Sequence, residues 1–211
     1  MQLTSTFTNA EITSEYDWQV SQEVNVINND GLVIAKAEIE IITLNKHRGA
    51  KQSYELLEQQ ETDWELPLNL YFAGHNLNEM LCNKLSIKPN PKKAQQHIMI
   101  EAISVLAEHR SKGIAMFLLQ AIADQYQKAQ SITVMSMPMR LFVDSENCQT
   151  DTAKRYYQSL QLEQDLTSAQ DLQQFFIKAG FVEYQVDSSL LAEPLSFDVF
   201  VTSPDKITKP V

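Results

Sequence analysis

Apolar and polar residues alternate along two segments near the amino-terminal end of the chain. Residues 18–26 and 33–41 each place an apolar side chain at every second position for most of their length. This period of two predicts strands with one buried face. The residues between them, 28–31, have the sequence Asn-Asn-Asp-Gly, which is typical of a tight turn. The pattern therefore predicts a β-hairpin.

Later in the chain, helical periodicity and short apolar runs follow one another. Apolar residues recur every three or four positions in the segments 51–86, 114–126, 151–163 and 168–179. Shorter apolar runs that predict strands lie at 98–105, 132–137 and 197–202. The first helical stripe is interrupted near Pro67 and ends at a proline-containing linker, 88–93. This succession predicts a mixed α/β fold, which we expect to form a single domain over residues 1–211.

Residues 98–119 place an apolar strand, a basic turn and a helix in direct succession. Ser111 is the expected N-cap of the helix. Free backbone N–H groups and the positive end of a helix meet at such a turn, and an anion could dock there. Gly113 and Ala115 lack bulk, so phosphates could approach the main chain closely. The alternative is an ordinary strand–turn–helix whose basic residues are only solvated.

Two motifs carry a resemblance to a known family. Arg110, Gly113 and Ala115 form R-x-x-G-x-A, which resembles the acyl-CoA-binding motif of the GNAT superfamily of N-acyltransferases. Residues 175–181, FFIKAGF, resemble that family's late motif, F-Y-x-K-x-G-F. The resemblance covers about residues 98–202. It implies a GNAT-like fold with a mixed, mostly antiparallel sheet, splayed central strands and flanking helices.

The resemblance also implies the cofactor, acetyl-CoA, and direct transfer of the acetyl group to an amine. The acceptor would be a small-molecule or peptide amine, and a homodimer is possible because dimers are frequent in such families. The pantetheine arm would pair along Ile103, Ser104 and Val105. The pyrophosphate would bind the turn formed by Arg110, Ser111, Lys112, Gly113, Ile114, Ala115 and Met116.

Glu101 is the candidate general base. It lies in an otherwise apolar strand, where a carboxylate is disfavoured unless it faces a cleft or a partner. Burial could raise its pKa toward a useful range. The competing interpretation is a carboxylate paired with a basic residue on a neighbouring strand.

The general acid is harder to place. The family's late-motif tyrosine corresponds to Phe176, which cannot donate a proton. Tyr156 and Tyr157, in an A-x-x-Y-Y sequence, are candidate replacements, or else plain core or surface aromatics. The thiolate could also leave without a protein acid. The alternative function is a catalytically inactive acyl-CoA-binding sensor or interaction module of the same fold.

The sequence leaves two interpretations open for segment 51–86 and two for Pro138. Segment 51–86 carries an acidic cluster that could act as a lid attracting an amine, or the segment could be a packing element without functional contact. The acidic residues are Glu55, Glu58, Glu61, Asp63 and Glu65. Pro138 could lie within a splayed strand, or the strand could end at Met137.

Composition excludes several other classes of function. The net charge of −10 argues against general nucleic-acid binding. A run of about 18 apolar residues is missing, and the N-terminal sequence lacks the pattern of a secretory signal, so we expect a cytoplasmic protein away from membranes. The cysteines, Cys82 and Cys148, and the four histidines show no ligand spacing, so no metal is expected.

Overall fold

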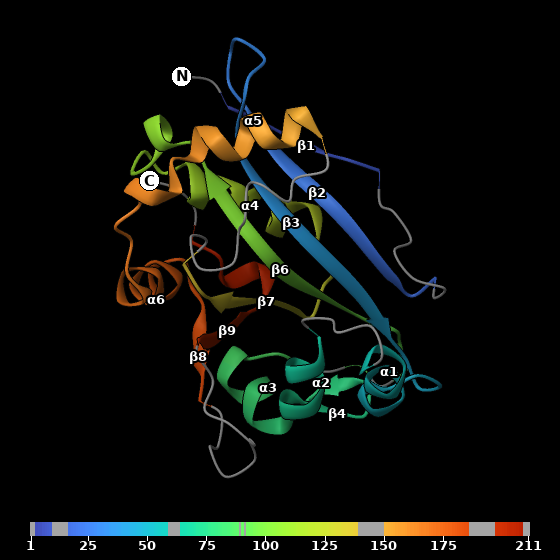
Figure 1. Cartoon of the computed structure of the whole chain (residues 1–211). Coiled ribbons are helices and arrows are strands. Elements are labelled where there is room, and N and C mark those ends of the chain that lie inside the picture. The colour runs from blue at the N-terminus through green and yellow to red at the C-terminus, as the bar shows by residue number, and fades with distance from the viewer. Residues whose placement is uncertain are drawn as a thin grey trace.

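A seven-stranded sheet forms the centre of the described part of the chain, in the order β1-β2-β3-β6-β7-β9-β8 (Figure 1). The structure is a computed structural model that describes residues 3–9, 17–58, 64–88, 90, 92–138, 150–185 and 197–208. The strands are β1 (Thr4–Phe7), β2 (Gln19–Ile27), β3 (Val33–Leu44), β6 (Gln95–Val105), β7 (Ser131–Ser136), β8 (Val182–Tyr184) and β9 (Asp198–Thr202). Neighbours pair antiparallel except β6 and β7, which are parallel. The expected mixed, mostly antiparallel fold is confirmed.

Helices cover both faces of this sheet. They are α1 (Ala50–Leu57), α2 (Glu65–Tyr71), α3 (Glu79–Leu85), α4 (Ile114–Gln125), α5 (Asp151–Leu160) and α6 (Ala169–Lys178). In the view of Figure 1, α4 lies behind the sheet, α5 crosses its upper part in front, and α1 to α3 gather below. We call the face that carries α1 to α3 and α5 the front face.

The predicted hairpin is confirmed as β2 and β3. The Asn28 side-chain oxygen accepts hydrogen bonds from the N–H groups of Asp30 and Leu32, both at 3.0 Å. Gly31 has φ +78°, a conformation that glycine adopts with least strain. Ala35, Ala37 and Ile39 of β3 are buried against the α4 side, where they share a core with Leu118 and Ile122. The alternation seen in the sequence therefore corresponds to one buried face.

Segment 50–85 is a folded block that packs on the front face. Trp64 and Leu68 are buried with Trp18, Ile42 and Met99 of the sheet region. The Tyr71 hydroxyl donates to Thr133 Oγ1 of β7 at 3.2 Å. These contacts account for the segment as a packing element.

The expected interruption near Pro67 corresponds to the break between α1, which ends at Leu57, and α2, which begins at Glu65. Pro67 lies in the first turn of α2, where its missing N–H has no intrahelical acceptor to lose. A second break separates α2 from α3. It is a short hairpin, β4 (Phe72–Ala73) and β5 (Asn76–Leu77), whose turn contains Gly74 at φ +65°.

The central strands β6 and β7 pair over only four residues. The parallel register joins His97 through Ile100 to Ser131 through Val134. Beyond that point β6 continues beside β3 to Val105, and β7 continues beside β9 to Ser136. The two strands therefore splay apart, as the fold resemblance implies. Pro138 lies two residues beyond the end of β7, so the strand ends before the proline.

The expected glycine cap ends α6. Gly180 has φ +95°, and the Phe181 N–H donates to the Phe176 carbonyl at 3.0 Å. A Cβ at Gly180 would lie 2.1 Å from the Lys206 carbonyl oxygen, so both dihedral angle and space require glycine.

We expect Gly180→Ala to destabilise the protein much more than Gly31→Ala. Both positions have positive φ, but a Cβ at Gly31 meets nothing within 4 Å. Gly31→Ala should cost about 1 kcal/mol of unfolding free energy from the dihedral angle alone. The steric clash at Gly180 should add about 2 kcal/mol or more. Urea denaturation measures both, and equal losses would contradict the cap geometry.

Burial of His97 makes the stability depend on pH. Its ring is fully buried beside Phe72, with 4.5 Å between the ring centroids, and burial lowers the pKa of His97 to about 3. Below pH about 6.5, the ordinary pKa of histidine, His97 is protonated in the unfolded chain but stays neutral in the folded protein. The free energy of unfolding therefore falls as pH falls. Between about pH 7 and about pH 5, the wild type should lose about 2 kcal/mol more than His97→Gln in urea denaturation. Equal losses would mean that His97 does not resist protonation in the folded state.

Candidate active site

The splay between β6 and β7 opens into a cavity of about 540 Å³. Glu101, Ala102 and Ile103 line it from β6, and Val134 and Met135 line it from β7. The wall is completed by the turn after β6, the first residues of α4, the segment around residues 165–167, and α6. The cavity therefore begins where the sheet stops pairing and ends at the start of a helix.

Most of the residues predicted to bind the cofactor line this cavity. These are Ile103, Val105, Arg110, Ser111, Gly113, Ile114, Ala115 and Met116. Ser104 and Lys112 are not among the lining residues. Lys112 is exposed, and its Nζ donates to the Glu108 carbonyl at 2.6 Å. The end of β6 and the turn before α4, both predicted to bind the cofactor, thus line the same cavity.

Backbone donors of α4 face this cavity end. The first hydrogen bond into the helix joins the Phe117 N–H to the Gly113 carbonyl at 3.0 Å. The N–H groups of Ile114, Ala115 and Met116 precede that bond and have no acceptor inside the helix. The positive end of the helix dipole lies at the same place. This end of the cavity suits an anionic group.

The N-cap of α4 is Gly113 and not Ser111, so that prediction is wrong. Gly113 has φ +77°, and Ser111 has φ +59°, an uncommon value for a residue with a side chain. Two left-handed residues so close together turn the chain sharply before the helix begins. A turn of this kind directs successive N–H groups toward a common point.

Arg110 is held by acceptors of the protein itself. Its Nε donates to the Val105 carbonyl at 3.2 Å and its Nη2 to the Leu160 carbonyl at 2.5 Å. Its Nη1 forms an ion pair with Asp165 at 3.5 Å. The guanidinium therefore ties the end of β6 to the end of α5 and to the cavity wall, which is a positioning role.

Glu101 lies at an irregularity of β6. Glu38 of β3 pairs with Ala102, whereas Ile39 pairs with Ile100, so Glu101 is an extra residue in the β6 strand. Such a bulge redirects a side chain locally. Glu101 is half-buried, lines the cavity and follows directly on the last residue that pairs with β7.

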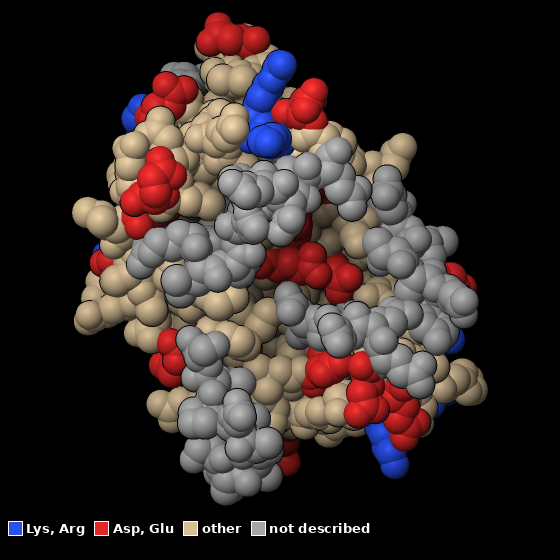
Figure 2. Space-filling model, viewed as in Figure 1, with Lys and Arg blue, Asp and Glu red and all other residues tan. Residues whose placement is uncertain are grey.

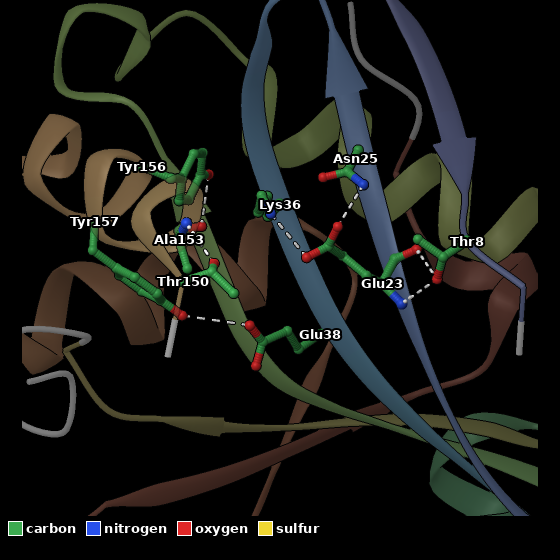
Figure 3. A network of polar contacts seen from close by, with 10 residues as sticks. Thr8, Glu23, Asn25, Lys36, Glu38, Thr150, Ala153, Tyr156 and Tyr157 are labelled. Atoms are coloured by element: carbon green, nitrogen blue, oxygen red, sulfur yellow. Dashed lines mark hydrogen bonds and ion pairs between the residues drawn. The ribbon is translucent and has the colours of Figure 1, made fainter. Parts of the chain in front are cut away.

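Tyr156 and Tyr157 do not line the cavity. Both project from α5 toward the front face of the sheet (Figure 3). The Tyr156 hydroxyl lies 2.9 Å from Ser104 Oγ, and burial raises the pKa of Tyr156 above its usual range. The Tyr157 hydroxyl makes a long hydrogen bond of 3.5 Å to Glu38. The two tyrosines thus fix α5 to β3 and β6.

The wall opposite β6 was not anticipated from the sequence, apart from Phe176. Phe176 is buried among Phe175, Phe181 and Phe200 and also lines the cavity. The other members are Asp165, Thr167, Asp171, Leu172 and Phe175. Ser168 is the N-cap of α6 and forms a capping box with Asp171, and its hydrogen bonds to the Asp171 carboxylate lower the pKa of Asp171. The capping pattern is visible in the sequence, but its position beside the cavity depends on the fold.

The acidic residues of segment 51–86 that the structure describes lie away from the cavity. Glu55 and Glu58 are exposed, and neither they nor Glu65 line it. Glu61 and Asp63 lie outside the described residues. The role of this segment as an acidic lid is therefore without support from the cavity geometry.

The described residues contain no group of three or more His, Cys, Asp or Glu side chains that could hold a metal ion. None of their helices is long and apolar enough to cross a membrane. Cys82 is a buried free thiol, whereas Cys148 lies outside the described part of the chain.

Comparison with known proteins identifies the class. The model of the acetyltransferase (GNAT) family matches residues 35–160, more than half of the chain. The chain therefore belongs to the GNAT acetyltransferase family. A search of curated protein sequences finds no significant match.

Two of the solved structures to which the chain is similar are those of N-acetyltransferases. Arylalkylamine N-acetyltransferase 2 from Aedes aegypti is 14% identical, with a TM-score of 0.39, over 86% of this chain and 73% of that chain. A polyamine N-acetyltransferase from Drosophila melanogaster is 13% identical, with a TM-score of 0.36, over 86% of this chain and 74% of that chain. Structural similarity at these TM-scores carries no information about the substrate of this chain.

We expect Arg110→Gln to reduce stability, because it removes the charged donor from two carbonyls and from Asp165. The loss should be about 2 kcal/mol in urea denaturation. Lys112→Gln, at the exposed neighbouring cation, should change stability by less than about 0.5 kcal/mol. If Arg110→Gln left stability unchanged and weakened only CoA binding, Arg110 would be a phosphate ligand and not a positioning residue.

Proposed function

We propose that the protein transfers an acetyl group from acetyl-CoA to a primary amine by direct attack, without a covalent enzyme intermediate. The observation that carries this proposal is the continuous cavity from the strand splay to the start of α4. One end offers the edge of β6 beyond its pairing with β7, beside the Glu101 carboxylate, and the other offers helical N–H groups that have no acceptor inside the helix. GNAT domains generally use acetyl-CoA or another acyl-CoA.

The cavity residues fit the two parts of such a molecule. The N–H groups that begin α4 would hold the pyrophosphate, since anions bind readily at helix N-termini. Within the described part of the chain, the edge of β6 from Ile103 to Val105 has no strand partner on the β7 side, and it would pair with the amides of the pantetheine arm. This arrangement would leave the thioester near Glu101, where the splay begins.

The reaction needs a neutral amine close to the thioester carbonyl. In our proposal Glu101 accepts a proton from the ammonium form of the acceptor, so that the nitrogen lone pair can attack the carbonyl carbon. The C–N bond forms, the C–S bond breaks, and the sulfur leaves as a thiolate. The nitrogen of the new amide then releases its second proton to water. Holding both reactants in line supplies much of the rate enhancement, and a base typically adds about 10²- to 10⁴-fold.

Protonation of the thiolate does not require a tyrosine in this proposal. Among the described residues that line the cavity there is no tyrosine, and Tyr156 and Tyr157 lie on the front face. The thiolate would therefore leave without a protein acid and take its proton from water.

Phe176 favours a second candidate, an acyl-CoA-binding module without turnover. Its ring lines the cavity where the family motif has a tyrosine, and its surroundings are aromatic core. The two candidates share the cofactor site and differ only in chemistry.

Calorimetry with CoA and a thiol-release assay against a panel of amines test both candidates. We expect CoA to bind, amines to release thiol, and Glu101→Gln to lower kcat by about 10²-fold or more while CoA affinity changes little. Glu163→Gln, an exposed carboxylate that does not line the cavity, is the matched control. Unchanged kcat in Glu101→Gln would remove Glu101 from the mechanism. Binding without turnover would favour the module, and no heat with CoA would overturn both candidates.

A further inference from the structure

One side chain of β7 lies between the cavity and an apolar cluster on the front face. We call this the front cluster, and its buried members are Tyr71, Leu77, Leu81, Cys82, Leu85, Val199 and Val201. Met135 lines the cavity beside the splay and also packs against the front cluster. Among the described residues, Met135 alone belongs to both sets. Its side chain therefore separates the end of the cavity at the splay from the apolar interior below.

The alternation of side chains along β7 places Met135 on the front face. Side chains two positions apart on a strand share one face. Thr133, two positions earlier, receives the hydrogen bond from the Tyr71 hydroxyl of α2 on the front face. Met135 also pairs with Val199 of β9, a buried member of the front cluster. Met135 itself is only half-buried, so part of its side chain is left to face the cavity.

The opposite wall of the cavity at the splay is rigid. Val134 and Phe176 line it and are each 4% exposed, within the core that also contains α4. The Phe176 ring is packed among Phe175, Phe181 and Phe200, with ring centroids 5.2, 5.5 and 5.8 Å away. A β-branched side chain and a closely packed ring have little freedom to move. An acyl group at the splay therefore has no room to extend toward this wall.

The front side of the same space is bounded by a small residue and a flexible one. Ala102 lines the cavity from β6 and carries only a methyl group. Met135 lines it from β7, with an unbranched thioether chain that can adopt several conformations. The apolar bulk on the front side is therefore the Met135 side chain. Behind that side chain lies the front cluster.

We propose that Met135 determines the length of the acyl group and limits the donor to acetyl-CoA, because its side chain closes the way toward the front cluster. This inference rests on the proposed function, since it concerns the donor of the same reaction. The methyl group of an acetyl thioester fits in front of Met135, whereas the further carbons of a longer acyl chain collide with the thioether. One additional methylene in an apolar pocket changes kcat/KM by about 10- to 200-fold.

The amine reaches the thioester from another direction in this proposal. Figure 2 shows the front face hollowed between α5 and the helices α1 to α3. This depression is open toward the viewer, whereas Met135 packs inward on the front cluster. A change at Met135 should therefore alter the choice of acyl donor and leave the choice of amine unchanged.

The kinetic test compares acetyl-CoA with butanoyl-CoA in the thiol-release assay, with the same amine. For the wild type, kcat/KM with butanoyl-CoA should be at least about tenfold lower. Met135→Ala removes the thioether chain and leaves a space that the two additional carbons of butanoyl can occupy. This variant should raise the ratio of butanoyl to acetyl kcat/KM about tenfold. Its relative kcat/KM for different amines with acetyl-CoA should stay within about twofold of the wild type.

Two further methionine variants are matched controls. Met137 also lines the cavity and is half-buried, but it lies two positions farther along the chain from the splay. Met137→Ala should leave the butanoyl-to-acetyl ratio within about twofold, and Met135→Leu, which conserves volume, should keep the preference for acetyl. A wild type that used both donors equally, or an equal shift in Met135→Ala and Met137→Ala, would overturn the inference. A change of amine preference in Met135→Ala without a change of donor preference would assign Met135 to the acceptor and overturn it as well.

Calorimetry without an amine separates this inference from the proposed function. The wild type should bind butanoyl-CoA about tenfold more weakly than acetyl-CoA, and Met135→Ala should remove the difference while its affinity for CoA stays that of the wild type. Met135→Val, which suits a strand, is the second variant and should remove part of the difference. This pattern without turnover would support the acyl limit and overturn the transferase. Equal affinities in the wild type, or a difference that persists in both variants, would overturn the acyl limit even if amines were acetylated.

Discussion

The short parallel pairing of β6 with β7 is the constraint on which the rest of the structure depends. The two strands hydrogen bond over four residues each and then follow different partners, β3 on one side and β9 on the other. Backbone groups of β6 beyond Ile100 therefore face a cavity on the β7 side instead of a neighbouring strand. A sheet that stayed paired along its whole length would have no space for a ligand at its centre.

The start of α4 closes the other end of that space. A strand that leads through a sharp turn into a helix brings helical N–H groups to the cavity. Arg110 holds this turn by contacts with Val105, Leu160 and Asp165, which belong to three different parts of the chain. Arg110, the charged residue of the family motif, is thus bound to the protein itself, and in the proposed function the backbone amides of α4 bind the pyrophosphate instead.

The front face divides into an apolar part and a polar part. Below, α1 to α3 bury Trp64 and Tyr71 against the sheet. Above, α5 is fixed by Tyr156 and Tyr157. Glu38 and Glu40 belong to β3, and Glu38 accepts the hydrogen bond from Tyr157 of α5.

The sequence by itself determined the β2–β3 hairpin, the strand–turn–helix of residues 98–119 and the glycine cap at Gly180, because these depend on local periodicity and turn chemistry. It also marked Glu101 as a carboxylate out of place in an apolar strand. Only the tertiary structure decided that Gly113 caps α4, that Arg110 is engaged by carbonyls far away in the chain, and that the tyrosines of α5 lie off the cavity. Those outcomes depend on contacts between distant segments and on strand register, which the spacing of residues along the chain does not encode.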